Sequence, residues 1–146
     1  MKNKMKTVIA LTILCGALLA GMVREGSAGE ILIIANPSVP ANVLDQQEIQ
    51  KIFLGKIAKW SNDDMVTIVV SKEEQVHKRF LNEYVKRSAN QFQMVWRQNL
   101  FTGKGKIPVQ VNSMDELVEY VANTEGAIGY ISSTESVPEQ VKVISQ

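Results

Sequence analysis

Cysteine and histidine are nearly absent from this sequence of 146 residues, which holds one of each. Cys15 lies in an N-terminal apolar stretch, so the rest of the chain has no thiol for a disulfide bond or a thiolate nucleophile. His77 has no second histidine with which to bind a metal, and no Gly-x-Ser-x-Gly nucleophile elbow is present. We therefore expect no catalytic residue, no metal site, no cofactor and no disulfide-linked partner.

An excess of either charge is also missing. Beyond residue 28 the chain carries twelve basic and fourteen acidic side chains, a net charge of −2. Proteins that bind nucleic acid or anionic membranes usually have a basic excess, so this balance indicates neither partner. Repeats, linkers and low-complexity tracts are absent too, and the length allows one domain.

The few large side chains that could bind a ligand are interpreted as packing residues. Trp60 and Trp96 fit a core better than a sugar-binding platform. His77 falls in line with Leu81 and Tyr84 on the apolar face of a predicted helix, which favours partial packing over ligand contact.

The first 28 residues have the three parts of a secretory signal peptide. Three lysines lie within the first six residues, an apolar run spans residues 7–22, and small residues occupy positions 26–28. An uncleaved membrane anchor is the alternative, but the apolar run is shorter than the roughly 20 residues that a spanning helix needs. We expect cleavage after Ala28, which would leave residues 29–146 as one domain that is periplasmic or secreted.

Strand-like apolar runs alternate with amphipathic segments along residues 29–146. Strands are predicted at residues 31–35, 65–70, 107–111 and 126–132, with a further edge strand at 141–145. Helix starts are marked by N-cap residues followed by Glu or Gln three positions later, at Asp45, Ser71, Ser88 and Ser113. This alternation predicts an α/β fold: a three-layer domain with a mainly parallel sheet of four or five strands.

The segment TGKGK, residues 102–106, has the composition of a phosphate-binding loop. It follows a helix predicted at residues 89–101, whose buried stripe is expected to be Phe92, Val95, Trp96 and Leu100. The segment therefore joins a helix to a strand, at the sheet edge where parallel strands begin, whereas ligands bind beyond their carboxyl ends. The Walker pattern also fails, because position 107 is Ile. We interpret Gly103 as the helix C-cap and the segment as a turn, with an anion site as the alternative.

Polar residues follow several predicted strands at the point where each strand ends. The serines among them are Ser38, Ser71, Ser113 and Ser132. Because parallel strands end at the same edge of a sheet, we expect these serines to form one polar rim beside helix N-termini, which favour a small anion. Serine is also the ordinary N-cap residue and needs no ligand to explain it, so both interpretations stay open.

Three segments carry a resemblance to a known family. QEIQKIFLGKIAKW at residues 47–60, TIVVS at 67–71 and TEGAIGYIS at 124–132 have the order and approximate spacing of the phosphate-binding protein of phosphate ABC importers. The chain thus resembles a class II periplasmic binding protein over most of residues 36–132. The resemblance implies that family's fold, export, a non-enzymatic solute-binding role and a membrane transporter as partner.

Two departures from this family bear on the expected ligand. Full members have two lobes that close on phosphate, whereas residues 29–146 are long enough for one. Phosphate-binding members carry an Arg-x-Asp-x-Ser-Gly-Thr turn, where this chain has Lys72 for the arginine, Glu74 for the aspartate and Val-His-Lys at 76–78. Lysine lacks the planar fork with which arginine holds an oxyanion. The resemblance therefore implies only a weaker anion-facing rim that includes Ser71, Lys72 and Gln75.

Two functions are consistent with these observations. The first is an exported, non-enzymatic binder of a small oxyanion such as phosphate. The alternative is a periplasmic interaction or sensory module that has lost ligand binding and docks onto a membrane receptor or another protein. A second lobe supplied by another chain is left open. The candidate ligand-binding residues are Ser38, Ser71, Lys72, Gln75, Ser113 and Ser132.

Overall fold

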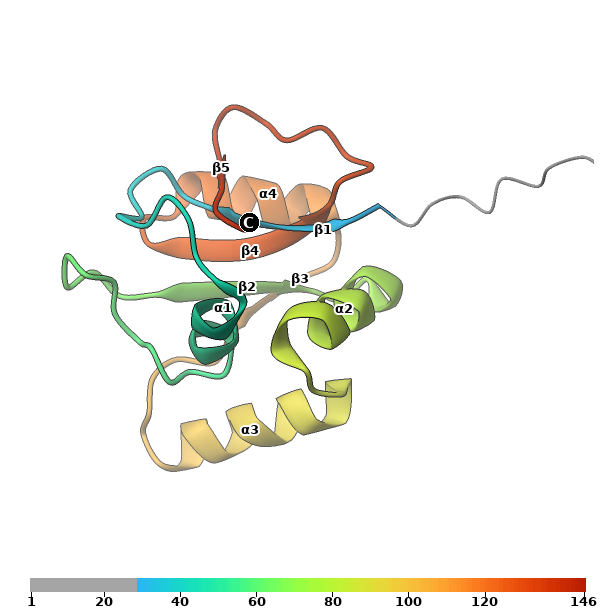
Figure 1. The fold of residues 1–146 in the computed structure, drawn as a ribbon. Helices are drawn as coiled ribbons and strands as arrows, with labels where there is room; N and C mark the ends of the chain where they lie inside the picture. Colours follow the sequence, from blue (N-terminus) through green and yellow to red (C-terminus); the bar gives the residue numbers. More distant parts are fainter. Residues whose placement is uncertain (1–28) are drawn as a thin grey trace, which may run out of the picture.

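The computed structural model describes residues 29–146, so the predicted signal peptide lies outside the described residues. A five-stranded sheet in the order β3-β2-β4-β1-β5 forms the centre (Figure 1). Its strands are β1 (Ile31–Ala35), β2 (Thr67–Ser71), β3 (Val109–Val111), β4 (Ala127–Ser132) and β5 (Lys142–Val143). The helices are α1 (Gln46–Phe53), α2 (Glu74–Phe80), α3 (Ala89–Phe101) and α4 (Met114–Asn123), and a π-helical turn η1 (Leu81–Val85) continues α2.

The direction of the strands defines two edges of the sheet. β2 runs parallel to both β3 and β4, whereas β1 runs antiparallel to β4 and β5. We call the edge where β2, β3 and β4 end the carboxyl edge, and the opposite one the amino edge. The predicted mainly parallel sheet with a fifth edge strand is confirmed. The direction of β1 is the exception, because an apolar run buried on both faces fits either orientation.

Helices cover both faces of the sheet (Figure 1). α4 lies on one face, and a Cβ at Gly129 of β4 would come within 2.6 Å of Leu117 on that helix. α1, α2 and η1 cover the other face, where the Phe80 ring stacks on Tyr130 of β4 with centroids 4.0 Å apart. The three-layer architecture is therefore confirmed.

α3 packs outside α1 and α2, farthest from the sheet (Figure 1). Its Trp96 donates an indole hydrogen bond to the carbonyl of Phe53, at 3.0 Å. Phe92 and Trp96 are buried as expected and Val95 is partly buried, but Leu100 is 56% exposed. The prediction for Leu100 was wrong because Asn99, one position earlier, faces the body and donates to the Leu54 carbonyl at 3.0 Å, which turns Leu100 toward solvent.

Both tryptophans are packing residues, as interpreted. Trp60 and Trp96 are buried, and each indole N–H donates to a backbone carbonyl, in Trp60 to that of Gly126 at 2.9 Å. Among the described residues, no helix combines the length and the apolar character of a membrane span.

Local capping signals located three of the four helix starts. Asp45, Ser88 and Ser113 each accept a hydrogen bond from the third backbone N–H of the helix that follows. The fourth prediction was wrong: α2 begins at Glu74, and its N-cap, Glu73, makes no side-chain cap bond. Ser71 instead stays in β2, because that strand continues its parallel pairing with β3 up to the Ser71–Val111 pair.

Candidate functional site

The carboxyl edge brings together most of the predicted site residues. Ser71 and Ser132 are the last residues of β2 and β4, and Ser113 follows β3 as the N-cap of α4. Lys72 directly follows Ser71, and Gln75 lies in the first turn of α2; both side chains are exposed.

Ser38 was wrongly placed on this rim. It follows β1, and because β1 is antiparallel to β4, the end of β1 lies where β4 begins. The Ser38 hydroxyl accepts a hydrogen bond from the N–H of Gly126, 3.0 Å away, just before β4. Ser38 therefore belongs to the amino edge.

The hydrogen-bonding groups of Ser71 have partners within the chain. Its N–H donates to the Tyr130 hydroxyl at 3.0 Å, and its own Oγ accepts from the N–H of Glu73 at 3.0 Å. Ser71 is 3% exposed. Ser132 is buried as well, and its hydroxyl pairs with that of Thr134 at 3.1 Å. Both serine hydroxyl oxygens therefore already have a hydrogen-bond partner within the chain.

Two successive hydrogen bonds connect Ser71 of β2, through Tyr130 of β4, to His77 of α2. The Tyr130 hydroxyl lies 2.6 Å from Nδ1 of His77. Because that hydroxyl already accepts from the Ser71 N–H, we assign its proton to the bond with Nδ1, which leaves the imidazole neutral with its hydrogen on Nε2. Burial lowers the pKa of His77 and raises the pKa of Tyr130, so both groups are held neutral. His77 is partly buried among aromatic rings, as interpreted.

The N-terminus of α4 holds carboxylates of the chain itself. Glu73 Oε1 accepts a hydrogen bond from the N–H of Met114 at 3.0 Å. Glu116 Oε2 accepts from the N–H of Asn112 at 2.8 Å, and the Ser113 hydroxyl accepts from the N–H of Glu116 at 3.2 Å. These backbone donors are the ones that an anion at this helix terminus would use. The helix terminus is therefore compatible with an oxyanion, and Glu73 supplies one.

Sequence reasoning missed this role of Glu73. In the structure Glu73 caps α4, and Glu74 forms an ion pair with Lys78 at 2.6 Å. No local pattern could reveal the bond from Glu73, since its partner Met114 lies 41 positions further along the chain.

Charges at the carboxyl edge are mixed, with several carboxylates. Burial and the negative charges of Asp115 and Glu73 raise the pKa of Glu135, which follows β4. Lys72 contributes a cation, and its Nζ lies 3.4 Å from Oδ1 of Asn112. A small anion at this edge would thus meet Lys72 and four carboxylates, those of Glu73, Asp115, Glu116 and Glu135. The described residues contain no group of three side chains suited to hold a metal ion.

The TGKGK segment lies at the amino edge, as predicted. Gly103 follows the last turn of α3 with φ of +70°, the left-handed conformation typical of the residue after a helix C-cap. Lys104 and Lys106 border a hollow of about 290 Å³ with a largely apolar lining that includes Met65 and Trp96. These lysines therefore lie at the amino edge, whereas the serine rim was predicted at the carboxyl edge.

Solved structures similar to this one are substrate-binding proteins. An ABC-type phosphate transport receptor from Vibrio cholerae matches with a TM-score of 0.58 and 21% identity, over 80% of this chain and 45% of that one. A protein described as a phosphate ABC transporter substrate-binding protein from Clostridium perfringens, solved with bound phosphate, matches with a TM-score of 0.61 and 20% identity, over 80% and 44%. PstS from Borrelia burgdorferi matches with a TM-score of 0.60 and 19% identity, over 80% and 47%.

These identities establish the fold, and this chain covers less than half the length of each of the three proteins. No curated protein matches the chain. The model of one protein family, described as the PBP superfamily domain, matches residues 27–146. This match includes every strand and helix of the structure. The chain therefore belongs to the protein family described as the PBP superfamily domain.

Proposed function

We propose that this chain is an exported, non-enzymatic protein of the solute-binding type, which binds a small oxyanion such as phosphate weakly at its carboxyl edge. The observation that carries the proposal is the bond from Met114 N–H to the Glu73 carboxylate, since it puts an oxyanion at the N-terminus of α4. The similar structures include a receptor for phosphate and a protein with bound phosphate, which supports phosphate as the first ligand to test.

Weak binding is expected for two physical reasons. A single lobe covers an anion on one side, so water continues to compete for its other side. In addition, Glu73 occupies the Met114 donor, and an incoming anion must displace that carboxylate or bind beside it. Lys72 offsets part of this repulsion, but an exposed lysine is screened by solvent.

Calorimetric titration with phosphate, sulfate and small carboxylates tests the proposal. Glu73→Gln keeps an oxygen to accept from Met114 and removes the negative charge, so phosphate affinity should rise roughly fivefold. Lys72→Ala should lower it by a similar factor. Lys78→Ala is the control: it also removes one positive charge, but from α2, where Lys78 is paired with Glu74. It should change phosphate affinity little. If no anion binds to the wild type or to Glu73→Gln, anion binding is wrong.

A second candidate function is favoured by the same internal bonds. The backbone N–H groups of Ser71, Asn112 and Met114 all donate to partners within the chain. An edge with its donors occupied in this way would not bind small anions. Such an edge suits an interaction module that docks onto a membrane receptor or another protein. A photo-crosslinker at the exposed Gln75 should then capture a membrane protein in cells, whereas one at the exposed Gln93 of α3 should not.

Export is tested separately. The protein recovered from the periplasmic fraction or the medium should begin at Gly29, as determined by N-terminal sequencing. A protein that retains Met1 and sediments with the membrane would favour the uncleaved anchor instead.

A further inference from the structure

We infer that the end of α3 and the loop after it form a docking surface for an anionic membrane. We call Leu100, Phe101 and Ile107 the apolar tip. Phe101 is 95% exposed, and Leu100 and Ile107 are each 56% exposed. Arg97, Lys104 and Lys106 alternate with these residues along the chain, and all three are exposed. This combination of exposed apolar and basic side chains is typical of surfaces that bind the membrane interface.

The tip continues the buried stripe of its own helix. Phe92, Trp96 and Leu100 recur every four residues, so they lie on one side of α3. Phe92 and Trp96 are buried against the body, while Leu100 and Phe101 are not. The apolar stripe of α3 is therefore buried at Phe92 and Trp96 and exposed at its end, where the described residues do not cover it. Neighbouring exposed apolar residues, such as Leu100 and Phe101, commonly mark an interaction site.

The charge around the tip indicates what the partner is. Residues 86–113 contain five basic side chains and no acidic one. The rest of residues 29–146 contains seven basic and fourteen acidic side chains. The near-neutral total thus hides a positive segment, so the overall charge balance does not exclude an anionic membrane as partner. Of the five, Arg97, Lys104 and Lys106 adjoin the tip in the chain, whereas Lys86 and Arg87 precede α3 at its other end.

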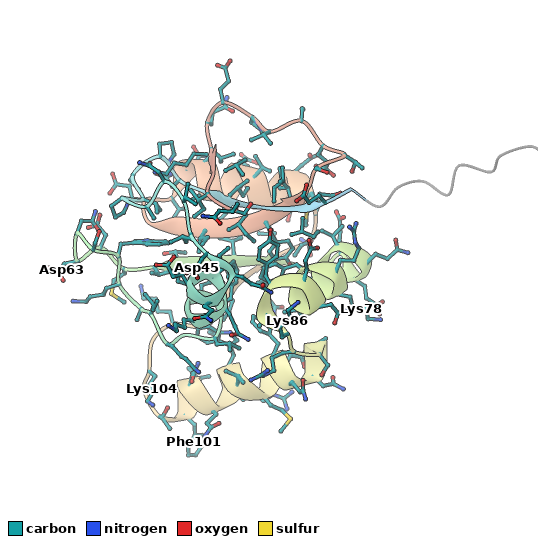
Figure 2. The ribbon with its side chains drawn as sticks, in the orientation of Figure 1. Asp45, Asp63, Lys78, Lys86, Phe101 and Lys104 are labelled. Carbon is teal, nitrogen blue, oxygen red and sulfur yellow. The ribbon has the colours of Figure 1, made fainter. Side chains whose placement is uncertain are left out.

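The shape favours a bilayer over a protein groove. Figure 2 shows Phe101 projecting outward at the lower end of the molecule, with Lys104 nearby and Lys78 on the other side. Added Cβ atoms at Gly103 and Gly105 would meet nothing within 4 Å, so the turn has open space around it. A projecting aromatic ring flanked by lysines can enter the interfacial region of a bilayer while the lysines remain at the phosphate level.

This surface is independent of the proposed anion site. The loop connects to the start of β3, so it lies at the amino edge, whereas Lys72 and Glu73 lie at the carboxyl edge. Membrane docking would leave the carboxyl edge facing away from the lipid. Failure of anion binding and failure of membrane docking are therefore separate results.

Vesicle cosedimentation tests the inference. Residues 29–146, which contain the whole described fold, are mixed with vesicles of phosphatidylcholine alone or of equal parts phosphatidylcholine and phosphatidylglycerol. We expect binding to the anionic vesicles that weakens with added salt, and little binding to phosphatidylcholine. Lys104→Ala and Lys106→Ala should each reduce the partition coefficient roughly fivefold. Phe101→Ser should reduce it roughly tenfold or more.

Matched controls separate the tip from general effects. Val43→Ser changes an apolar side chain that is 55% exposed elsewhere, and Lys78→Ala removes one positive charge from α2; neither should alter vesicle binding. Circular dichroism should be unchanged in Phe101→Ser, because Phe101 makes little contact with the body. The inference is wrong if the protein ignores anionic vesicles or if Phe101→Ser binds like the wild type. It is also wrong if sedimentation velocity without lipid shows a dimer that Phe101→Ser abolishes, since a second copy would then cover the tip.

Discussion

The two edges of the sheet differ in whether their side chains and backbone groups have partners within the chain. At the carboxyl edge, polar groups that the sequence places beside one another are bound internally, through Tyr130, Glu73 and Glu116. At the amino edge, apolar and basic side chains of the α3 loop have no such partners and project outward. The difference teaches that polar residues at a strand end do not by themselves make an available site.

The amino edge is itself divided into a fixed part and a free part. In the fixed part, the turn at Gly126 accepts the indole hydrogen bond of Trp60 and donates its N–H to Ser38. In the free part, the turn at Gly103 follows α3 with open space around it. Both glycines have positive φ, of +72° and +70°, so they form a matched pair for substitution.

The largest expected effect is on this pair. Gly126→Ala should reduce the free energy of unfolding by about 3 kcal/mol, because the left-handed conformation is strained for alanine and the new Cβ would lie 2.4 Å from the Met65 carbonyl oxygen. Gly103→Ala should cost about 1 kcal/mol, from the backbone conformation alone. Urea denaturation measures both. Equal losses of unfolding free energy in the two variants would mean that the turn at Gly126 is held no more tightly than the turn at Gly103.

Next in size is an effect at the carboxyl edge. Tyr130→Phe removes the hydroxyl that serves both the Ser71 N–H and His77 Nδ1, and should reduce the free energy of unfolding by about 1 to 3 kcal/mol. Tyr84→Phe is the control: its hydroxyl donates to the Ile31 carbonyl at 3.0 Å and bonds to the Ser145 hydroxyl, which is only partly buried, so its removal strands no fully buried donor. A smaller loss, about 1 kcal/mol, is expected there. If Tyr130→Phe is neutral, the bonds of the Tyr130 hydroxyl do not stabilise this edge.

The pH dependence of stability gives a third, smaller effect. Burial puts the pKa of His77 in the folded state below its value of about 6.5 in the unfolded chain. The unfolded state therefore binds a proton first as the pH falls, and stability present above pH 6.5 is lost below it. The slope cannot exceed about 1.4 kcal/mol per pH unit.

His77→Gln should abolish this loss of stability, as measured by urea denaturation between pH 7.5 and pH 5. Glu135 acts with the opposite sign, because a raised folded-state pKa favours the folded state as the pH falls. Glu135→Gln removes that contribution and serves as the control. An unchanged pH slope in His77→Gln would show that burial does not lower the pKa of His77 in the folded state.

How much of this could be predicted from sequence depends on the distance over which each signal acts. Asp45, Ser88 and Ser113 were located because a capping bond spans three residues. The direction of β1 and the bond from Glu73 to Met114 depend on partners far along the chain, and no local pattern records them. Leu100 fits its helical stripe, but Asn99 takes the inward position in the last turn of α3, which only the packed structure shows.

The smallest expected effect compares single lysines at the two edges. Lys104→Ala should leave phosphate affinity unchanged within a factor of about two, because the length of β2 puts roughly 16 Å between the edges. That separation is about twice the Debye length of about 8 Å at physiological salt, so the charge of Lys104 is largely screened at the carboxyl edge. Lys72→Ala should do the reverse: weaken phosphate binding and leave vesicle binding unchanged. Titration and cosedimentation of both variants measure this. A tenfold loss of phosphate affinity in Lys104→Ala would mean that the anion binds at the amino edge, and that the two edges are not separate surfaces.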